Sequence, residues 1–575
     1  MAGSCSLLSL PRELILQTLD YNHPSTVLKV ALTCSTLYRQ CQHVLERHRD
    51  AYDKHRVASD LSPETVVNLL KDTATARIER WHVRELEIWG SRDTWQDWRP
   101  WAPKLPGPYG LAEDEEPSRS ALDAQEVQRY IRKGIEWWEF SGNDISEVQQ
   151  NLELGSDAYL KLLLIASCPR LHSIRFVKRE HDTWTSLHSI GKAIRWSKAL
   201  NSRLPVAIWK WPPGFWSLRS LAVGISTGLL PRKEKVLRLQ NIFEELFHIP
   251  HLKDLYFKGV SEPNQDEVED GYGFPFGTSS IKNLFLDSPY DAGLDFLSDV
   301  ASAPKDLQTI AIRARVPTAL SLIDVNYFVS DLARKSPRLQ RLVFYNGEGL
   351  GGDRCSMYCP EELEDFTAIK QITIAAEDIE LGGYSIADPV FADMLDEWIE
   401  EAFPHSMEAM YIWGKTDIFP HQSEIDAYGT SGTLDLMLAH LIKSGAYRNL
   451  KVIYVENAER AHRQPDREVL RRRPIVAGRK ELAFQMTLAA GKKAGVHVCT
   501  LMNKDDDGGY WKNFPAKPDR FDLKTSPCAG ERPEDWKLNL YTGERGPDCR
   551  GCGECKECLV VYPPELWKKN NISKA

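Results

Sequence analysis

The sequence predicts an α/β protein that begins with a helical segment, continues as a long irregular solenoid with an inner parallel sheet, and ends in a cysteine-rich tail. Three observations predict this organisation. Short amphipathic segments fill the first 48 residues, a six-residue apolar pattern recurs ten times between residues 83 and 455, and five of the twelve cysteines lie in the last 48 residues. The expected boundaries are 1–48 for the helical segment, 49–505 for the solenoid and 506–575 for the tail.

Composition excludes several classes of protein. The 575 residues carry 72 Lys and Arg against 81 Asp and Glu, so the formal net charge of −9 argues against a protein that mainly neutralises nucleic-acid phosphates. The most apolar run, residues 159–168, is well short of the roughly 20 residues of a membrane-spanning helix. The N-terminus has no basic segment before its short apolar stretch, unlike a secretory signal. We therefore expect an intracellular protein of the cytoplasm, the nucleus or both, with no nucleic-acid or membrane partner.

Residues 10–47 have the pattern of three short helices. Pro11 and Pro24 stand at helix-start positions, and Ser35 or Thr36 can cap a third helix. Apolar residues recur at helical spacing in each segment: Leu14, Ile15 and Leu19; Val27, Leu28, Ala31 and Leu32; Leu37, Cys41, Val44 and Leu45. A unit this small cannot bury much of its own apolar surface. We therefore expect a partner to cover that surface, either the rest of this chain or another protein.

The residues 10–41, LPRELILQTLDYNHPSTVLKVALTCSTLYRQC, resemble the F-box, a short helical docking motif. The matching positions are Leu10, Pro11, Glu13, Leu14, Leu19, Tyr21, Pro24, Leu28, Leu32 and Cys34. The sequence departs from the family at Thr18, Asn22 and Thr33, and it has Leu37-Tyr38 where many members have Trp-Arg, a variant similar to the filamentous-fungal branch.

The resemblance implies docking onto the Skp adaptor of a Skp-cullin-F-box (SCF) ubiquitin ligase. The implied adaptor-binding residues are Leu10, Pro11, Leu14, Ile15, Leu19, Leu28 and Leu32. The alternative is that the three helices only cap a larger domain of the same chain.

The middle of the chain repeats the pattern apolar-x-x-apolar-x-apolar. The ten copies are Val83/Leu86/Ile88, Leu171/Ile174/Phe176, Leu218/Leu221/Val223, Leu252/Leu255/Phe257, Ile281/Leu284/Leu286, Leu307/Ile310/Ile312, Leu339/Leu342/Phe344, Ile369/Ile372/Ile374, Met407/Met410/Ile412 and Leu450/Ile453/Val455. The last two apolar positions alternate as in a short strand, and the first fills the turn before it. The spacing varies, since residues 281 and 307 are 26 apart but 171 and 218 are 47 apart.

This pattern predicts a leucine-rich-repeat-like solenoid in which each unit buries its face on its neighbours. The Asn or Cys that normally follows the strand in regular repeats is absent, so we expect variable turns there. Acidic insertions are expected near 105–125 and 261–273. The alternative is one or two ordinary α/β domains. An F-box joined to degenerate leucine-rich repeats resembles the filamentous-fungal F-box family.

Twelve of the seventeen tryptophans lie between residues 81 and 216. We interpret them as large side chains that fill an uneven core. The alternative is that Trp95, Trp98 and Trp101 anchor a binding face.

The tail contains Cys549, Cys552, Cys555 and Cys558 at a strict three-residue spacing. A C-x-x-C loop directs two thiolates at one metal, so the spacing predicts a structural zinc site. Only two residues join the two pairs, and Cys528 is therefore a further candidate ligand. Free thiols and iron–sulfur ligation are the alternatives, although the fourth spacing and Leu559 depart from the ferredoxin pattern.

Two catalytic signatures are absent: the sequence has no H-E-x-x-H and no G-x-x-x-x-G-K-[ST] motif. We therefore expect a non-catalytic substrate-recognition subunit that binds the Skp adaptor, through it a cullin, and an unidentified protein substrate. The alternatives are a repeat scaffold outside the ligase and an enzyme with an unrecognised site.

Overall fold

The computed structural model describes most of the chain and divides into two compact units. The first unit comprises Met1–Lys235, Asn241–Lys253 and Lys524–Trp536, and the second comprises Val236–Gln240, Asp254–Leu523 and Lys537–Ala575. The described residues are 10–102, 110–112, 115–177, 183–205, 210–225, 240–260, 273–287, 289, 292–313, 322–345, 360–379, 390–413, 432–455, 484–499, 522–523, 537–539 and 544–546.

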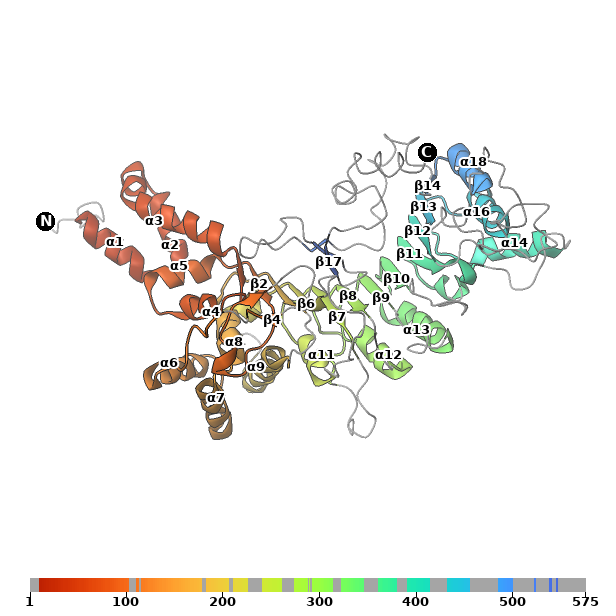
Figure 1. Cartoon of the computed structure of the whole chain (residues 1–575). Helices are drawn as coiled ribbons and strands as arrows, with labels where there is room; N and C mark the ends of the chain where they lie inside the picture. Colours follow the sequence, from red (N-terminus) through yellow and green to blue (C-terminus); the bar gives the residue numbers. More distant parts are fainter. Residues whose placement is uncertain are drawn as a thin grey trace, which may run out of the picture. The chain divides into compact units, whose positions relative to one another are not determined.

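The first unit contains a four-stranded parallel run in chain order, to which a helical N-terminus is attached (Figure 1). The strands are β1 (Val57–Ser59), β2 (Glu85–Ile88), β5 (Ser173–Val177) and β6 (Ser220–Ile225). The helices are α1 (Arg12–Tyr21), α2 (Pro24–Ala31), α3 (Ser35–His55), α4 (Pro63–Leu70), α5 (Ala74–His82), η2 (Trp95–Asp97), α6 (Ala124–Ile135), α7 (Gly142–Leu154), α8 (Ala158–Ser167), α9 (Thr185–Ser202), α10 (Pro213–Ser217) and α11 (Gln240–Leu246). A small antiparallel pair joins β3 (Trp101–Ala102) to β4 (Gly110–Leu111).

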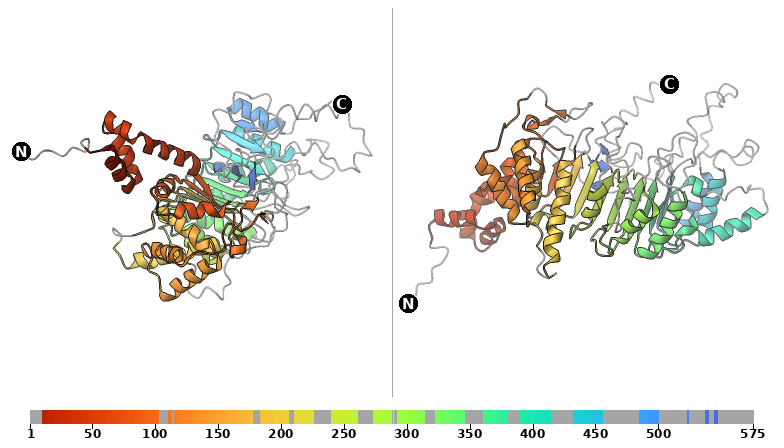
Figure 2. Two further views of the ribbon diagram at one scale, coloured as in Figure 1. Left: turned by 60° about the vertical axis from the view of Figure 1, so that its left-hand side comes forward. Right: turned by 90° about the horizontal axis from the view of Figure 1, so that it is seen from below.

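The second unit contains eight parallel strands, again in chain order. They are β7 (Asp254–Lys258), β8 (Asn283–Asp287), β9 (Thr309–Arg313), β10 (Arg341–Tyr345), β11 (Gln371–Ala375), β12 (Ala409–Trp413), β13 (Val452–Val455) and β14 (His497–Cys499). The helices are α12 (Leu294–Ser302), α13 (Leu322–Lys335), η5 (Pro360–Leu363), η6 (Ala376–Asp378), α14 (Val390–Glu401), α16 (Gly432–Ser444) and α18 (Gln485–Ala494). Figure 2 shows the green strands of this unit side by side, with helices along one side of them. A separate antiparallel sheet contains β15 (Asp522–Leu523), β16 (Lys537–Asn539) and β17 (Glu544–Gly546).

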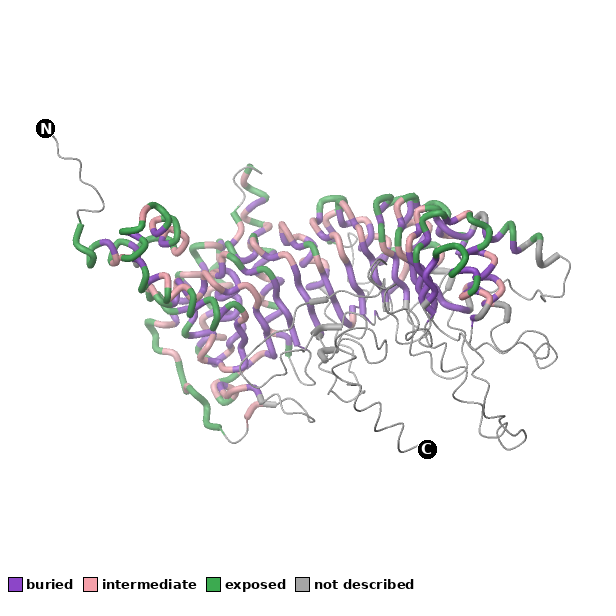
Figure 3. Tube along the Cα trace, turned by 90° about the horizontal axis from the view of Figure 1, so that it is seen from above, coloured by how far each residue is buried: buried purple, intermediate pink, exposed green. Residues whose placement is uncertain are grey.

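Each of the ten apolar hexads forms a strand. The second hexad position of one strand pairs with the second position of the next, as in Leu284 with Ile310 and Ile372 with Met410. All thirty hexad side chains are buried, none of them more than 6 % exposed. Figure 3 shows this burial as purple tube along the strands. Because the second and third positions of every copy share one face, stacking the copies produces a continuous apolar layer.

The turn that enters each strand is regular. In most repeats, one backbone carbonyl accepts two N–H groups from the next repeat, as the carbonyl of Arg84 does from His172 and Ser173. The carbonyl of Gln308 does the same for Gln340 and Arg341. This backbone ladder aligns successive repeats without an Asn side chain. The segments that follow the strands, where we expected variable turns, lie largely outside the described residues.

Two features differ in detail from the expectation. Strand β1 matches no hexad, and it pairs with β2 through Ala58 and Leu86. The third N-terminal helix continues to His55, so the expected boundary at residue 48 falls inside α3. The fold class is α/β with twelve parallel strands, four in the first unit and eight in the second, and its repeated strand-and-helix arrangement is solenoid-like.

Candidate functional site

The N-terminal hook, residues 10–55, contains the three helices that the sequence predicts. Pro11 is the N-cap of α1, and Pro24 occupies the first turn of α2. The Sγ atom of Cys34 accepts the Leu37 N–H at 3.5 Å and caps α3. Proline suits the first turn because backbone N–H groups there have no acceptor within the helix, so the N–H that proline lacks is not needed. The hook is the part of the first unit that we consider as an interaction surface.

The hook has a small core of its own. Its buried members are Ile15, Leu19, Val27, Ala31, Leu37, Cys41, Val44 and Ala51, and Ile78 of α5 joins them. Ile15 is 1 % exposed and Leu19 is 4 % exposed. Two of the seven residues proposed for adaptor binding therefore face the hook's interior and maintain its shape.

The other five proposed residues, Leu10, Pro11, Leu14, Leu28 and Leu32, are exposed. Leu28 is 57 % exposed and Leu32 is 74 % exposed. Within the part of the chain that the structure describes, six of the twelve large exposed apolar side chains lie between residues 10 and 38: Leu10, Leu14, Tyr21, Leu28, Leu32 and Tyr38. Scattered apolar residues are ordinary on a surface, but such a concentration on one small element is typical of an interaction site.

Histidines join the hook to α5. The Nδ1 atom of His48 on α3 lies 2.9 Å from the Nε2 atom of His82 on α5. Burial, followed by the nearby His48, Arg84 and Arg170, lowers the pKa of His82 to about 4. Burial and Arg47 also lower the pKa of His48. The pair is therefore neutral near pH 7, as a close contact between two imidazoles requires.

A second contact fixes the start of α2. The ring of His23 packs edge-on against Trp81 of α5 at 4.5 Å between centroids, and the Arg170 guanidinium lies over the same indole at 5.0 Å. These contacts hold the buried side of the hook against α5, while its exposed leucines remain uncovered.

The predicted tryptophan segment fills core space. Trp98 is completely buried and Trp101 is 6 % exposed. The indole N–H of Trp98 donates to the Gly155 carbonyl at 2.7 Å, and that of Trp95 donates to the Glu153 carbonyl at 2.8 Å. The interpretation of Trp98 and Trp101 as core-filling side chains is confirmed.

Four buried charges, which the sequence analysis missed, hold this segment in place. Lys161 Nζ lies 2.8 Å from both Asp60 Oδ2 and Asp157 Oδ2, and Arg92 lies 3.1 Å from Asp157. None of the four side chains is more than 3 % exposed. The only signal for the cluster in the sequence is the i, i+4 spacing of Asp157 and Lys161 on α8. The charges are matched, so the cluster has a structural role.

The remaining predicted sites lie outside the described residues. These are the tail cysteines, Cys528, Cys549, Cys552, Cys555 and Cys558. Over the described ranges, no group of three or more His, Cys, Asp or Glu side chains is placed to hold a metal ion. No described helix is both long and apolar enough to cross a bilayer.

Comparisons with known proteins find similarity among solved structures alone. No protein-family model matches the chain. No curated protein matches it. Among solved structures, the chain is similar to a crystallised protein from Bacteroides fragilis, with 10% sequence identity over 64% of this chain and 87% of that one and a TM-score of 0.27.

Proposed function

We propose that this chain is a non-catalytic substrate-recognition subunit of an SCF ubiquitin ligase. In this proposal the hook binds the Skp adaptor, and through it a cullin, while the repeats hold a target protein. The resemblance of residues 10–41 to the F-box supports the Skp adaptor as the partner of the hook. The solenoid-like strand-and-helix repeats support a target-binding array.

The observation that carries the proposal is the exposure of the hook's leucines. A helical cap would turn its apolar side chains toward the domain that it covers. Here Ile15 and Leu19 face inward, whereas Leu14, Leu28 and Leu32 are exposed. Together with Leu10 and Pro11, these three form the revised adaptor-binding set.

The proposed chemistry requires no catalytic group in this chain. A receptor accelerates ubiquitin transfer by raising the effective concentration of target lysines near the conjugating enzyme. Its own task is to bind two partners at once, which suits an exposed docking element followed by a repeat array.

A repeat scaffold outside the ligase is the second candidate. It is favoured by the participation of Ile78 in the hook's core and by the contact between His48 and His82, which tie the hook to α5. In that case the hook would be a cap, and its exposed leucines would have no adaptor to bind.

Co-purification tests the proposal. Tagged full-length chain is expected to recover adaptor and cullin, and Leu14→Ala with Leu32→Ala is expected to lose both. Ile135→Ala with Leu154→Ala is the matched control, because these side chains are 50% and 56% exposed but lie on α6 and α7. Failure of the folded wild-type chain to recover adaptor, or equal recovery by the hook variant, would favour the scaffold.

A further inference from the structure

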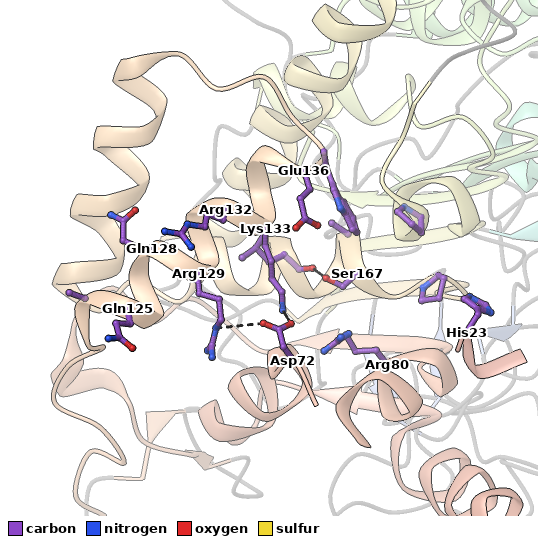
Figure 4. Close-up of a pocket in the computed structure, with 16 residues that line it drawn as sticks. His23, Asp72, Arg80, Gln125, Gln128, Arg129, Arg132, Lys133, Glu136 and Ser167 are labelled. Carbon is purple, nitrogen blue, oxygen red and sulfur yellow. Dashed lines mark hydrogen bonds and ion pairs between the residues drawn. The ribbon is translucent and has the colours of Figure 1, made fainter. Parts of the chain in front are cut away.

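A cavity of about 1050 Å³ lies within the first unit, and no motif in the sequence pointed to it. Figure 4 shows its lining: side chains of α6 on one side, and Asp72, Arg80 and His23 on the other. Its volume is at the upper end of the range for ligand pockets. Unlike most such pockets, it contains several charged side chains.

The charge in the cavity is unbalanced. Four cations, Arg80, Arg129, Arg132 and Lys133, face two carboxylates, Asp72 and Glu136, which gives a formal excess of two positive charges. An excess of one sign inside a hollow favours a ligand of the opposite sign.

Two of the four cations are occupied by the fold. Arg80 donates to the carbonyls of Leu69 and Lys71 at the end of α4. Lys133 donates to the Leu70 carbonyl at 2.7 Å and pairs with Asp72 at 2.6 Å. Both side chains satisfy carbonyl groups that a helix end leaves without partners, so they are structural.

The other two cations are less tightly held. The Nε atom of Arg129 is buried without a hydrogen-bond partner among the described residues and lies 4.0 Å from Asp72 Oδ2, while its Nη2 atom lies 3.7 Å from Glu126 Oε1. The Arg132 side chain has no hydrogen bond or ion pair with any residue that the structure describes, and it is exposed. Gln125 and Gln128 share the lining with them. The spacing of these four residues, i, i+3, i+4 and i+7, places them along one face of α6.

Part of the lining is apolar. Pro169, Pro213 and the ring of Trp137 contribute accessible surface, whereas Leu163 and Ala166 of α8 are almost completely buried. Along α6, the distance from residue 125 to residue 132 is about 10 Å, which is the length of about three extended residues.

We propose that this cavity binds an acidic peptide segment of a partner protein. Carboxylates of the peptide pair with Arg129 and Arg132, the amides of Gln125 and Gln128 hydrogen-bond its backbone, and an apolar side chain packs on Pro213 and the ring of Trp137. A free phosphate would use the two arginines but would leave the amides and the apolar lining without a role. The inference goes beyond the proposed function and does not depend on adaptor binding.

Fluorescence anisotropy with the full-length chain tests this. The probe is a fluorescein-labelled Glu-Leu-Glu-Leu-Glu peptide, and its counterpart is Lys-Leu-Lys-Leu-Lys. We expect saturable binding of the acidic peptide, weakened by added NaCl, and no binding of the basic one. Arg129→Gln with Arg132→Gln is expected to weaken binding at least tenfold. Arg49→Gln with Arg203→Gln, which removes two exposed charges outside the cavity lining, is expected to leave the affinity unchanged.

Several results would overturn the inference. These are no saturation of the acidic peptide at millimolar concentration, equal affinity of the two double variants, or displacement of the peptide by pyrophosphate at an equal or lower concentration than by unlabelled peptide. If the double variant does not fold, Arg132→Gln alone serves, because that side chain is exposed. Leu14→Ala with Leu32→Ala is expected to bind the peptide normally, so a failure of adaptor binding and a failure of peptide binding are distinguishable.

Discussion

The imidazole of His48 lies against that of His82, with 2.9 Å between Nδ1 and Nε2, at the place where α3 of the hook packs on α5. Both pKa values are lowered, mainly by burial. His55 belongs to the same contact region and its pKa is also lowered by burial, although Glu79, 3.4 Å away, opposes the shift. The attachment of the hook to α5 thus depends on neutral histidines.

This arrangement predicts a stability that falls in mild acid. The unfolded chain binds a proton near pH 6.5, whereas folded His82 binds one only near pH 4, so its contribution is full above pH 6.5 and is lost as the pH falls from 6.5 to 4. We expect a loss on the order of 1–2 kcal/mol from this residue, because it is partly exposed to solvent. Urea unfolding followed at pH 7.5 and pH 4.5 measures it.

The variant His82→Asn isolates the contribution of this histidine. The free energy of unfolding of this variant should depend less steeply on pH than that of the wild type. His43→Gln, at an exposed position of α3, is the control and should retain the wild-type slope. A His82→Asn variant with the wild-type slope would show that other groups cause the effect.

The side chain of Thr373 replaces part of the ladder between β10 and β11. Its buried hydroxyl accepts the Phe344 N–H at 2.7 Å and donates to the Phe344 carbonyl at 2.8 Å. Thr373→Val keeps the shape but leaves these two backbone groups without the hydroxyl, so we expect a loss of about 1–3 kcal/mol in the free energy of unfolding. Thr373→Ser retains the hydroxyl and should lose less. Chemical denaturation of the two variants gives the comparison, and equal losses would mean that the hydroxyl contributes no more than the methyl group.

The buried charges around Lys161 should be sensitive to the loss of one partner. Lys161→Met leaves Asp60 and Asp157 close together with Arg92 as their remaining cation, and breaking such a buried set costs about 3–5 kcal/mol. Lys192→Met breaks the exposed pair with Glu147 and should cost less than about 1 kcal/mol. Thermal unfolding measures both, and Trp98 and Trp101 provide a fluorescence signal near the cluster. Similar midpoints for the two variants would contradict the structural role of the cluster.

The strands could be predicted from the sequence because the hexad positions on one face of each strand are apolar and fully buried. An apolar residue at positions such as Leu284 and Leu286 repeats with the period of a strand, and stacking requires the same pattern in every copy. Strand β1 was not readable, because Val57–Ser59 is too short to show a period.

The orientation of individual side chains was less predictable. Leu14 and Ile15 are adjacent in the sequence, yet one is exposed and the other is buried in the hook. Helical spacing identifies an apolar face, but it does not show which part of that face the neighbouring helices cover. The cavity and the Lys161 cluster combine residues that are distant in sequence, so their chemistry depends on the three-dimensional fold.

The central claim is that the exposed leucines of the hook bind the Skp adaptor, and titration calorimetry of the purified full-length chain with purified adaptor tests it most directly. We expect one-to-one binding by the wild type and an affinity at least a hundredfold weaker for Leu14→Ala, Leu28→Ala and Leu32→Ala combined, because burial of each leucine contributes about 1.5–3 kcal/mol. A folded wild-type chain that binds no adaptor, or a triple variant that binds as tightly as the wild type, would contradict it.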